Sequence, residues 1–316
     1  MRSAECVTPS HPDKLCDRIS DSILDACLQQ DPYSRVAVES MGGHGLLVIM
    51  GEITTTASVD YEKIARTVVG EEIKIIVHIS LQSREIAQGV DVGGAGDQGI
   101  MVGYASAETE EYMPAEVIFA RKLAQFMYKK YPVDGKTQCT YDEMTGKILS
   151  LVASFQGVTK SQLEADVQEW LTLMKHGDVS SIFCNPAGDW NSGGFDADTG
   201  LTGRKIAVDS YGPRIPVGGG AFSGKDATKV DRSGAYMARK IAVDLLRANN
   251  AKEVYVYLAY SIGIAEPVQA TAVIDGVEQE ILGYDLTPEG IISLLKLRTP
   301  QFAQRAMWGH FGHETI

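Results

Sequence analysis

A pattern of helix, hairpin and second helix occurs three times along the 316 residues, and this repetition constrains the fold more than any other feature. Apolar residues at helical spacing predict the helix that opens each copy, over 12–30, 114–131 and 229–249. Two strand-like runs around a turn follow each helix, at 35–40 and 46–55, 137–141 and 147–156, and 254–262 and 268–274. A further helix closes each copy, over 61–69, 159–175 and 288–297.

The repeats predict an α+β fold of three similar domains, each a mostly antiparallel sheet with helices on one face. We expect the domains at 1–90, 93–191 and 192–316, with strands free to swap between them. A chain of this length exceeds one ordinary hydrophobic core, which agrees with several domains. The alternative is that so common a motif recurs by chance.

Composition narrows the classes of function. A formal net charge of −12 disfavours nucleic-acid binding and requires any anion site to gather its basic residues locally. The five cysteines form no CxxC pair, so they indicate neither zinc nor a disulfide framework and fit a reducing cytosol. The longest apolar run, 46–50, is too short to cross a bilayer, and the N-terminus lacks a signal-peptide pattern. We therefore expect a cytoplasmic protein without a membrane partner.

Two glycine-rich segments nearly match nucleotide-binding motifs. Residues 94–99 fit GxGxxG, but a polar segment precedes them and the strand-like run 100–102 follows, which excludes a dinucleotide-binding Rossmann unit. Residues 219–226 fit GxxxxGK but continue with aspartate, where a P-loop needs Ser or Thr. A P-loop phosphotransferase remains an alternative, although no alternating β/α pattern accompanies the motif.

The second glycine-rich segment still predicts a phosphate site. Glycines let backbone amides approach an anion, and amides at a helix start attract one. Lys225, Lys229 and Arg232 share one face if a helix begins near Lys225. Cations at a helix N-terminus oppose the macrodipole, and a bound polyphosphate would relieve that conflict. The alternative interpretation is a solvated basic face.

Six segments resemble the signatures of S-adenosylmethionine synthetases, in the same order and over nearly the whole chain. They are 11–14 (HPDK), 51–55 (GEITT), 94–99 (GAGDQG), 200–206 (GLTGRKI), 218–232 (GGGAFSGKDATKVDR) and 309–312 (GHFG). The resemblance implies pseudo-threefold symmetry among the three domains. It also implies homodimers or dimers of dimers, with active sites at the subunit interface.

The implied reaction joins ATP and L-methionine. The methionine sulfur attacks C5′ of ATP and displaces the triphosphate, which the family then cleaves to pyrophosphate and phosphate. A thioether sulfur has no proton to lose, so the reaction needs positioning and stabilisation of the leaving group rather than a base. The family uses Mg²⁺, two ions per site, and K⁺.

The resemblance assigns roles to residues of this chain. The residues at the triphosphate are His11, Lys136, Arg204, Lys205 and Lys225. Further ATP contacts are Asp134, Gly135, Asp189, Trp190, Asp198 and Ala221. The methionine-binding residues are Glu52, Gln88, Asp97, Asp198 and Lys229. The metal ligands are Asp13 and Asp231 for Mg²⁺ and Glu39 for K⁺.

His11 also has a purely structural interpretation. Ser10 and Asp13 have the spacing of a capping box around Pro12, so His11 could simply begin a helix.

Three departures from the family pattern stand out. Only two residues separate 88–91 from Gly94, where the family has a longer mobile lid, so we expect looser gating or broader tolerance of methionine analogues. The segment 71–85 and the C-terminus are also short. Asp189 replaces a family arginine, although Trp190 can still stack on adenine. A third hypothesis, a non-catalytic relative, is disfavoured because the histidine, the magnesium carboxylates and the lysines are all present.

Overall fold

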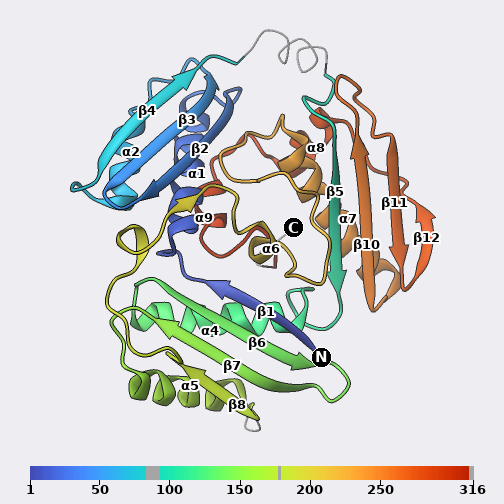
Figure 1. Cartoon of the computed structure of the whole chain (residues 1–316). Coiled ribbons are helices and arrows are strands. Elements are labelled where there is room, and N and C mark those ends of the chain that lie inside the picture. Colours follow the sequence, from blue (N-terminus) through green and yellow to red (C-terminus); the bar gives the residue numbers. More distant parts are fainter. Residues whose placement is uncertain (83–92, 177–178, 313–316) are drawn as a thin grey trace.

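The computed structural model describes residues 1–82, 93–176 and 179–312. Figure 1 shows three β-sheets arranged around a common centre. The first sheet contains, in order, β9 (Gly200–Leu201), β2 (Arg35–Gly43), β3 (Leu46–Thr54) and β4 (Lys74–Ser80). The second contains β1 (Arg2–Val7), β6 (Gly135–Asp142), β7 (Lys147–Phe155) and β8 (Ser181–Cys184). The third contains β5 (Gly99–Ser106), β10 (Glu253–Tyr260), β11 (Gln269–Ile274) and β12 (Val277–Glu280).

The three sheets exchange strands in a cycle. Strand β1, from the start of the chain, pairs with β6 in the second sheet, and β5 pairs with β10 in the third. Strand β9 closes the cycle by pairing with β2 in the first sheet. Each sheet therefore begins with an antiparallel strand from another part of the chain and continues with the local hairpin. This equivalent order confirms the predicted threefold repetition.

The helices lie where the sequence predicts them. The long helices α1 (Pro12–Gln30), α4 (Ala115–Lys130) and α7 (Val230–Asn249) pack on the first, second and third sheets. The shorter helices α2 (Tyr61–Val69), α5 (Lys160–Met174) and α8 (Pro288–Leu295) each contact the long helix of the same repeat. The single-turn elements are η1 (Gly194–Asp196), α6 (Ile206–Asp209) and α9 (Phe302–Arg305).

The third repeat differs from the other two at its sheet edge. Along the chain, α2 connects β3 to β4 and α5 connects β7 to β8. Each helical crossover brings the chain back in the same direction, so these edge pairs are parallel. Strand β12 instead follows β11 through a tight turn and is antiparallel, and α8 comes afterwards. The edge strands β4, β8 and β12 were not predicted, because they are short or lack a buried face.

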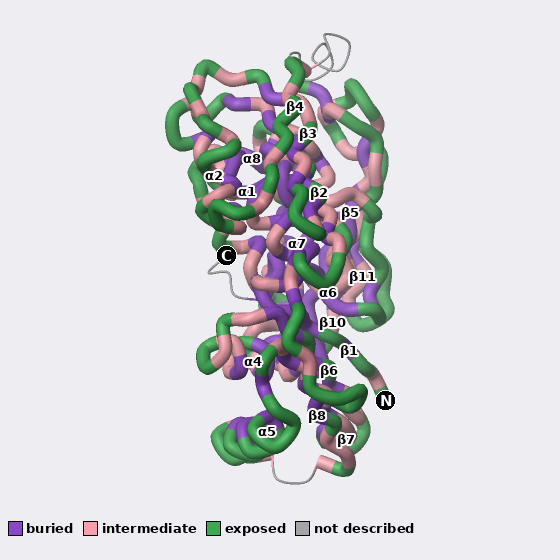
Figure 2. The backbone as a smooth tube through the Cα atoms, turned by 60° about the vertical axis from the view of Figure 1, so that its left-hand side comes forward, coloured by how far each residue is buried: buried purple, intermediate pink, exposed green. Residues whose placement is uncertain are grey.

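Within the described ranges the buried residues form two hydrophobic cores rather than three, and Figure 2 shows buried residues along the middle of the molecule. One core joins the first and third sheets, with Ile19 and Ile23 of α1 and Met237 and Ile241 of α7. The second sheet has a core of its own, between α4, α5 and β7. The shared core places loops of the C-terminal third directly against α1.

All five cysteines are buried free thiols. Among the helices of the described ranges, none has the length and apolar character needed to span a membrane.

Candidate active site

His11 forms the N-cap of α1. Its Nδ1 accepts a hydrogen bond from the Asp13 amide at 3.1 Å, so the neutral ring keeps its proton on Nε2 as a donor. Burial, and then the positive charges of Lys205 and Lys136, lower the pKa of His11 to about 3. The predicted cap at Ser10 is therefore wrong by one residue, because the ring itself caps the helix. His11 therefore begins the helix, as its structural interpretation expects, and its neutral ring keeps one N–H donor; its contact to a triphosphate stays a prediction.

Asp13 lies at the centre of a group of cations. Its fully buried carboxylate accepts from Lys205 Nζ at 2.5 Å and from the Leu201 amide at 3.0 Å, and Arg204 Nε lies 3.2 Å away. Burial raises the pKa of Asp13, but the hydrogen bonds from Lys205 and Leu201 outweigh it and the net pKa is lowered. An ionised carboxylate thus holds the loop cations beside His11.

Strand exchange adds Lys136 to this group. In the second sheet Lys136 of β6 lies opposite Val7 of β1, four residues before His11. Gly135 and Thr8 fix this junction, since Thr8 donates its amide to the Gly135 carbonyl and accepts the Gly135 amide through Oγ1. The position of Lys136 explains its effect on the pKa of His11. We call His11, Asp13, Lys136, Arg204 and Lys205 the His11 cluster.

A pocket of about 520 Å³ opens beside the His11 cluster, lined by Ser10, Asp134, Phe195 and neighbouring residues. One carboxylate oxygen of Asp134 accepts from the Gly194 amide at 2.9 Å, while Oδ1 is buried without a protein hydrogen-bond partner. Burial raises the pKa of Asp134. Asp198 lies close enough for its charge to act on both Asp134 and His11. Asp134 thus places a buried carboxylate with one unpaired oxygen in the wall of the pocket.

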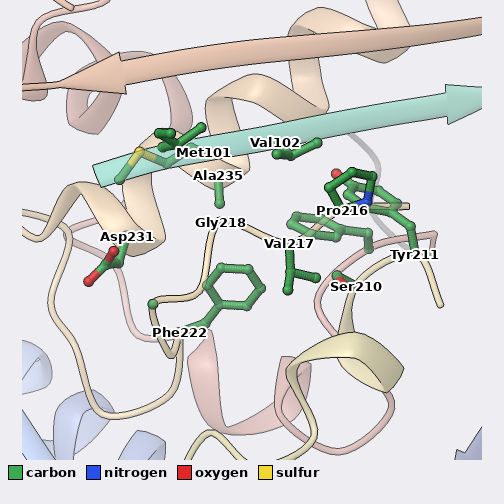
Figure 3. Close-up of a pocket in the computed structure, with 13 residues that line it drawn as sticks. Met101, Val102, Ser210, Tyr211, Pro216, Val217, Gly218, Phe222, Asp231 and Ala235 are labelled. Carbon is green, nitrogen blue, oxygen red and sulfur yellow. The ribbon is translucent and has the colours of Figure 1, made fainter. Parts of the chain in front are cut away.

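A second group of site residues surrounds the start of α7. Lys225 Nζ pairs with Asp231 at 2.6 Å, and Figure 3 shows Asp231 beside Phe222 and the strand that carries Met101. A Cβ on Gly220 would lie 2.1 Å from the Asp231 carboxylate, so glycine is required there. We call Lys225, Asp231 and the loop 218–225 the Asp231 cluster.

The predicted helical face of Lys225, Lys229 and Arg232 is wrong. Helix α7 begins at Val230, and Lys229 is its N-cap. The buried Asp226 prevents an earlier start because it is bonded to Val36 of β2. The Val36 amide donates to the Asp226 carboxylate, and the Asp226 amide donates to the Val36 carbonyl. Lys229 Nζ contacts Asp226 at 2.5 Å, and Arg232 points inward. Lys225 alone of the three faces Asp231.

Predicted methionine and potassium residues lie near the Asp231 cluster. Lys225 forms a backbone bridge with Ala37 of β2. Ala37 in turn pairs with Glu52 of β3, and Glu39 lies two residues after Ala37 in β2. Glu39 and Glu52 share the sheet face turned away from the buried Val36 and Val38. Asp97 is exposed two residues before Gly99, which adjoins Asp231. Gln88 and the expected short lid lie outside the described residues.

The two clusters contact α1 at different points, one at its start and the other near its middle. Asp13 belongs to the His11 cluster, whereas Asp21 accepts the amide of Gly224 in the loop of the Asp231 cluster. Eight helical residues separate the two aspartates by about 12 Å. Ala221 lies between the clusters, since a Cβ on Gly203 would lie 2.5 Å from it.

Asp189 and Trp190 have contacts of their own in the second repeat. Asp189 accepts from the amide of Lys160, at the start of α5, at 2.8 Å and from Asn185 at 3.2 Å. Trp190 donates its indole N–H to Asn185 at 3.3 Å. Their predicted ATP contacts stay predictions, and the carboxylate of Asp189 is already engaged.

Metal ligands are sparse within the described ranges, where no group of three or more histidine, cysteine or acidic side chains could enclose an ion. Asp13 and Asp231 are single carboxylates in separate clusters. Mg²⁺ characteristically uses one or two protein carboxylates together with phosphate oxygens and water. The donors present therefore fit an ion that arrives with a polyphosphate.

Several residues that support the predicted site residues were not predicted from the sequence. These are Thr8, Lys14, Asp17, Asp21, Gly194 and Asp209. One available signal was the spacing of aspartates by four along the first helix, where a buried face was expected.

The exchanged sheets and the two clusters of paired cations and carboxylates are features that fit an enzyme acting on an anionic substrate. Models of the S-adenosylmethionine synthetase N-terminal, central and C-terminal domains match residues 1–86, 92–190 and 192–316. The chain belongs to the S-adenosylmethionine synthetase family. Its function is the formation of S-adenosylmethionine from ATP and L-methionine, so the P-loop phosphotransferase alternative is wrong.

Individual relatives agree with this assignment. The chain is 41% identical to the S-adenosylmethionine synthase of Brachyspira hyodysenteriae, covering 99% of this chain and 93% of that protein. The synthase of Clostridium tetani is 40% identical, with 99% and 94% covered. A solved structure described as an unusual S-adenosylmethionine synthetase from Campylobacter jejuni superposes with a TM-score of 0.88 at 32% identity, covering 99% of this chain and 94% of that one. The Brachyspira alignment spans 366 positions against 316 residues here, so this chain is a shortened member.

Proposed function

We propose that the His11 cluster and the Asp231 cluster, contributed by two copies of this chain, form one methionine adenosyltransferase site. The observation that carries the proposal is the arrangement around Asp13. A buried carboxylate holds Lys205 and Arg204 beside a neutral histidine whose free N–H can donate to phosphate. This arrangement suits a reaction that must stabilise a leaving triphosphate.

In the proposed reaction a bond forms between the methionine sulfur and C5′ of ATP while the C5′–O5′ bond breaks. The sulfur becomes a sulfonium, and the triphosphate leaves with the electron pair. His11 donates through Nε2 near the departing oxygen, and Lys136, Arg204, Lys205 and Lys225 balance its charge. Water then cleaves the bound triphosphate to pyrophosphate and phosphate.

The nucleoside is proposed to occupy the pocket beside Asp134. The unpaired Oδ1 of Asp134 is suited to accept from a ribose hydroxyl, and Gly135 and Asp198 border the same region. Ala221, Asp189 and Trp190 remain proposed contacts to ATP. Methionine is proposed to lie near Asp231, bound by Glu52, Gln88, Asp97, Asp198 and Lys229.

Asp13 and Asp231 are the proposed ligands of two Mg²⁺ ions, and Glu39 of K⁺. When bound, these cations neutralise phosphoryl oxygens. Until then Lys205 and Lys225 supply the opposite charge to the two aspartates. We also propose a cytoplasmic location, which suits five buried free thiols.

A second copy of the chain is the proposed partner, as a homodimer or a dimer of dimers. The outer face of the first sheet exposes large apolar side chains, including Met41 (53%), Met50 (51%) and Ile76 (42%). Glu39 and Glu52 share this face, so a partner seated there would meet site residues directly. The units 1–90, 93–191 and 192–316 would each keep one sheet, with exchanged outer strands.

Product analysis tests the proposed function. The purified protein is mixed with ATP, Mg²⁺ and K⁺, with and without L-methionine. We expect methionine-dependent S-adenosylmethionine together with pyrophosphate and phosphate. Formation of ADP regardless of methionine, or no turnover, would contradict the proposal.

A further inference from the structure

Helix α1 carries a row of aspartates at intervals of four residues, which we call the aspartate row: Asp13, Asp17, Asp21 and Asp25. Residues four apart share one face of a helix, where like charges repel. The first three are also buried, and a buried carboxylate is unfavourable unless it is paired and hydrogen-bonded. The row therefore needs partners from outside the helix.

Each member of the row accepts backbone N–H groups from the C-terminal third. The donors are Leu201 to Asp13 (3.0 Å), Gly203 to Asp17 (2.8 Å), Gly224 to Asp21 (2.8 Å), and Gln301, Phe302 and Ala303 to Asp25 (3.0, 3.0 and 2.9 Å). One rigid helix thus fixes the spacing of three separate segments, 201–203, 224 and 301–303.

Asp17 anchors the loop that carries two site cations. It binds the amide of Gly203, and Arg204 and Lys205 follow immediately. Gly203 has a φ of +82°, which a side chain would strain. Lys14 Nζ bonds both Asp17 at 3.0 Å and Asp209 at 2.6 Å, so the segment 203–209 is held at both ends.

Asp21 anchors the loop of the Asp231 cluster in the same way. It binds the amide of Gly224, the residue before Lys225, and pairs with Arg232 at 2.7 Å. Arg232 in turn donates to the Phe222 carbonyl at 2.6 Å. A Cβ on Gly224 would lie 1.9 Å from the Val38 carbonyl oxygen, so the backbone here has no room to shift.

We propose that Asp17 and Asp21 are positioning residues: Asp17 for Arg204 and Lys205, and Asp21 for Lys225. The inference rests on the proposed function of those cations at the triphosphate. Neither aspartate touches substrate; each fixes the backbone amide that directly precedes a site cation. Asp25 belongs to the same row but anchors α9, which carries no proposed site residue, so it provides a matched control.

The test compares Asp17→Asn, Asp21→Asn and Asp25→Asn in the full-length protein. Asparagine keeps the size and one acceptor but removes the charge. We expect kcat per folded molecule to fall by about tenfold or more in the first two variants, because misplaced cations stabilise the leaving group less. The KM for methionine should stay within about threefold, and Asp25→Asn should keep kcat within about twofold while losing a similar amount of thermal stability.

Equal kcat in all three variants would overturn the proposal and leave the row with a structural role only. Hydrogen exchange gives an independent readout that needs no turnover. We expect lost protection at 201–205 in Asp17→Asn alone and at 222–226 in Asp21→Asn alone. In wild-type protein, exchange at Gly203 and Gly224 as fast as at the open Gly219 would overturn the proposal even if the variants fail to fold. Absence of product from wild-type protein would instead contradict the proposed function.

Discussion

At the scale of single residues, the His11 cluster depends on groups whose ionisation the fold has fixed. His11 is neutral because it is buried and faces Lys205 and Lys136. Asp13 is ionised because it accepts hydrogen bonds from Lys205 and Leu201. The neutral His11 donates a hydrogen bond, and the ionised Asp13 holds cations beside it. This combination favours binding of an anion over abstraction of a proton, which agrees with a nucleophile that has no proton to lose.

The lowered pKa of His11 predicts how stability changes with pH. The unfolded chain binds a proton at His11 below about pH 6.5, whereas the folded chain does not until about pH 3. Wild-type stability should therefore fall as the pH drops through this window, by up to about 1.4 kcal/mol per pH unit from this group. His11→Asn keeps a helix-cap acceptor without the titration, so urea unfolding should show a shallower decline. Parallel declines in the two proteins would contradict the assignment.

Asp134 supplies a test of the nucleoside pocket. Asp134→Asn can still accept from Gly194 but replaces the unpaired acceptor with an amide, so the KM for ATP should rise about tenfold to a hundredfold. Stability should be unchanged. Asp142→Asn, at the last residue of β6, serves as the control and should leave the KM unaltered. An unchanged KM in Asp134→Asn would remove Asp134 from the site.

At the scale of elements, Asp189 tests a contact at the start of α5. Its carboxylate accepts the Lys160 amide, one of the helix-start amides that lack a partner within the helix. Asp189→Ala should therefore cost about 1 kcal/mol of stability. We expect the KM for ATP to stay within about twofold, since the carboxylate is already engaged. A large rise in KM with unchanged stability would instead support the ATP contact that the sequence predicts.

The sequence was sufficient to predict the elements whose apolar residues recur with a clear helical or strand period. Helix α1 and strands β3 and β7 lie within a residue or so of their predicted positions, because each has a clear buried face. Strands β1 and β9 could not be predicted, because their partners lie 125 or more residues away and local pattern carries no such pairing.

The same limit applies to the site. Motifs identified the residues of the His11 cluster but not why they meet: Lys136 reaches His11 only through exchange of β1. The common helical face of Lys225, Lys229 and Arg232 was wrong because Asp226 bonds to β2, a tertiary contact that keeps the helix from starting near Lys225. The aspartate row was visible in the sequence, but its partners are backbone amides, which no side-chain pattern reveals.

At the scale of the whole molecule, the outer face of the first sheet predicts self-association. Met50→Glu places an unpaired charge in the proposed interface, so the dimer should weaken by about 100-fold or more. Light scattering after gel filtration should show monomers, and activity should fall with them. Met144→Glu, in the exposed β6–β7 turn, should remain a dimer with full activity. A Met50→Glu dimer of unchanged affinity would place the interface elsewhere.

Complementation between two inactive variants tests most directly whether each active site combines the His11 cluster of one chain with the Asp231 cluster of another. Lys205→Ala and Lys225→Ala are co-expressed with different tags, and the mixed dimers are isolated. Each mixed dimer would hold one site with both clusters intact, so we predict about half of wild-type S-adenosylmethionine formation. Mixed dimers of Lys205→Ala with Asp13→Asn, two changes in the same cluster, should remain inactive. Activity in the first mixture no higher than in the single variants would contradict the shared site.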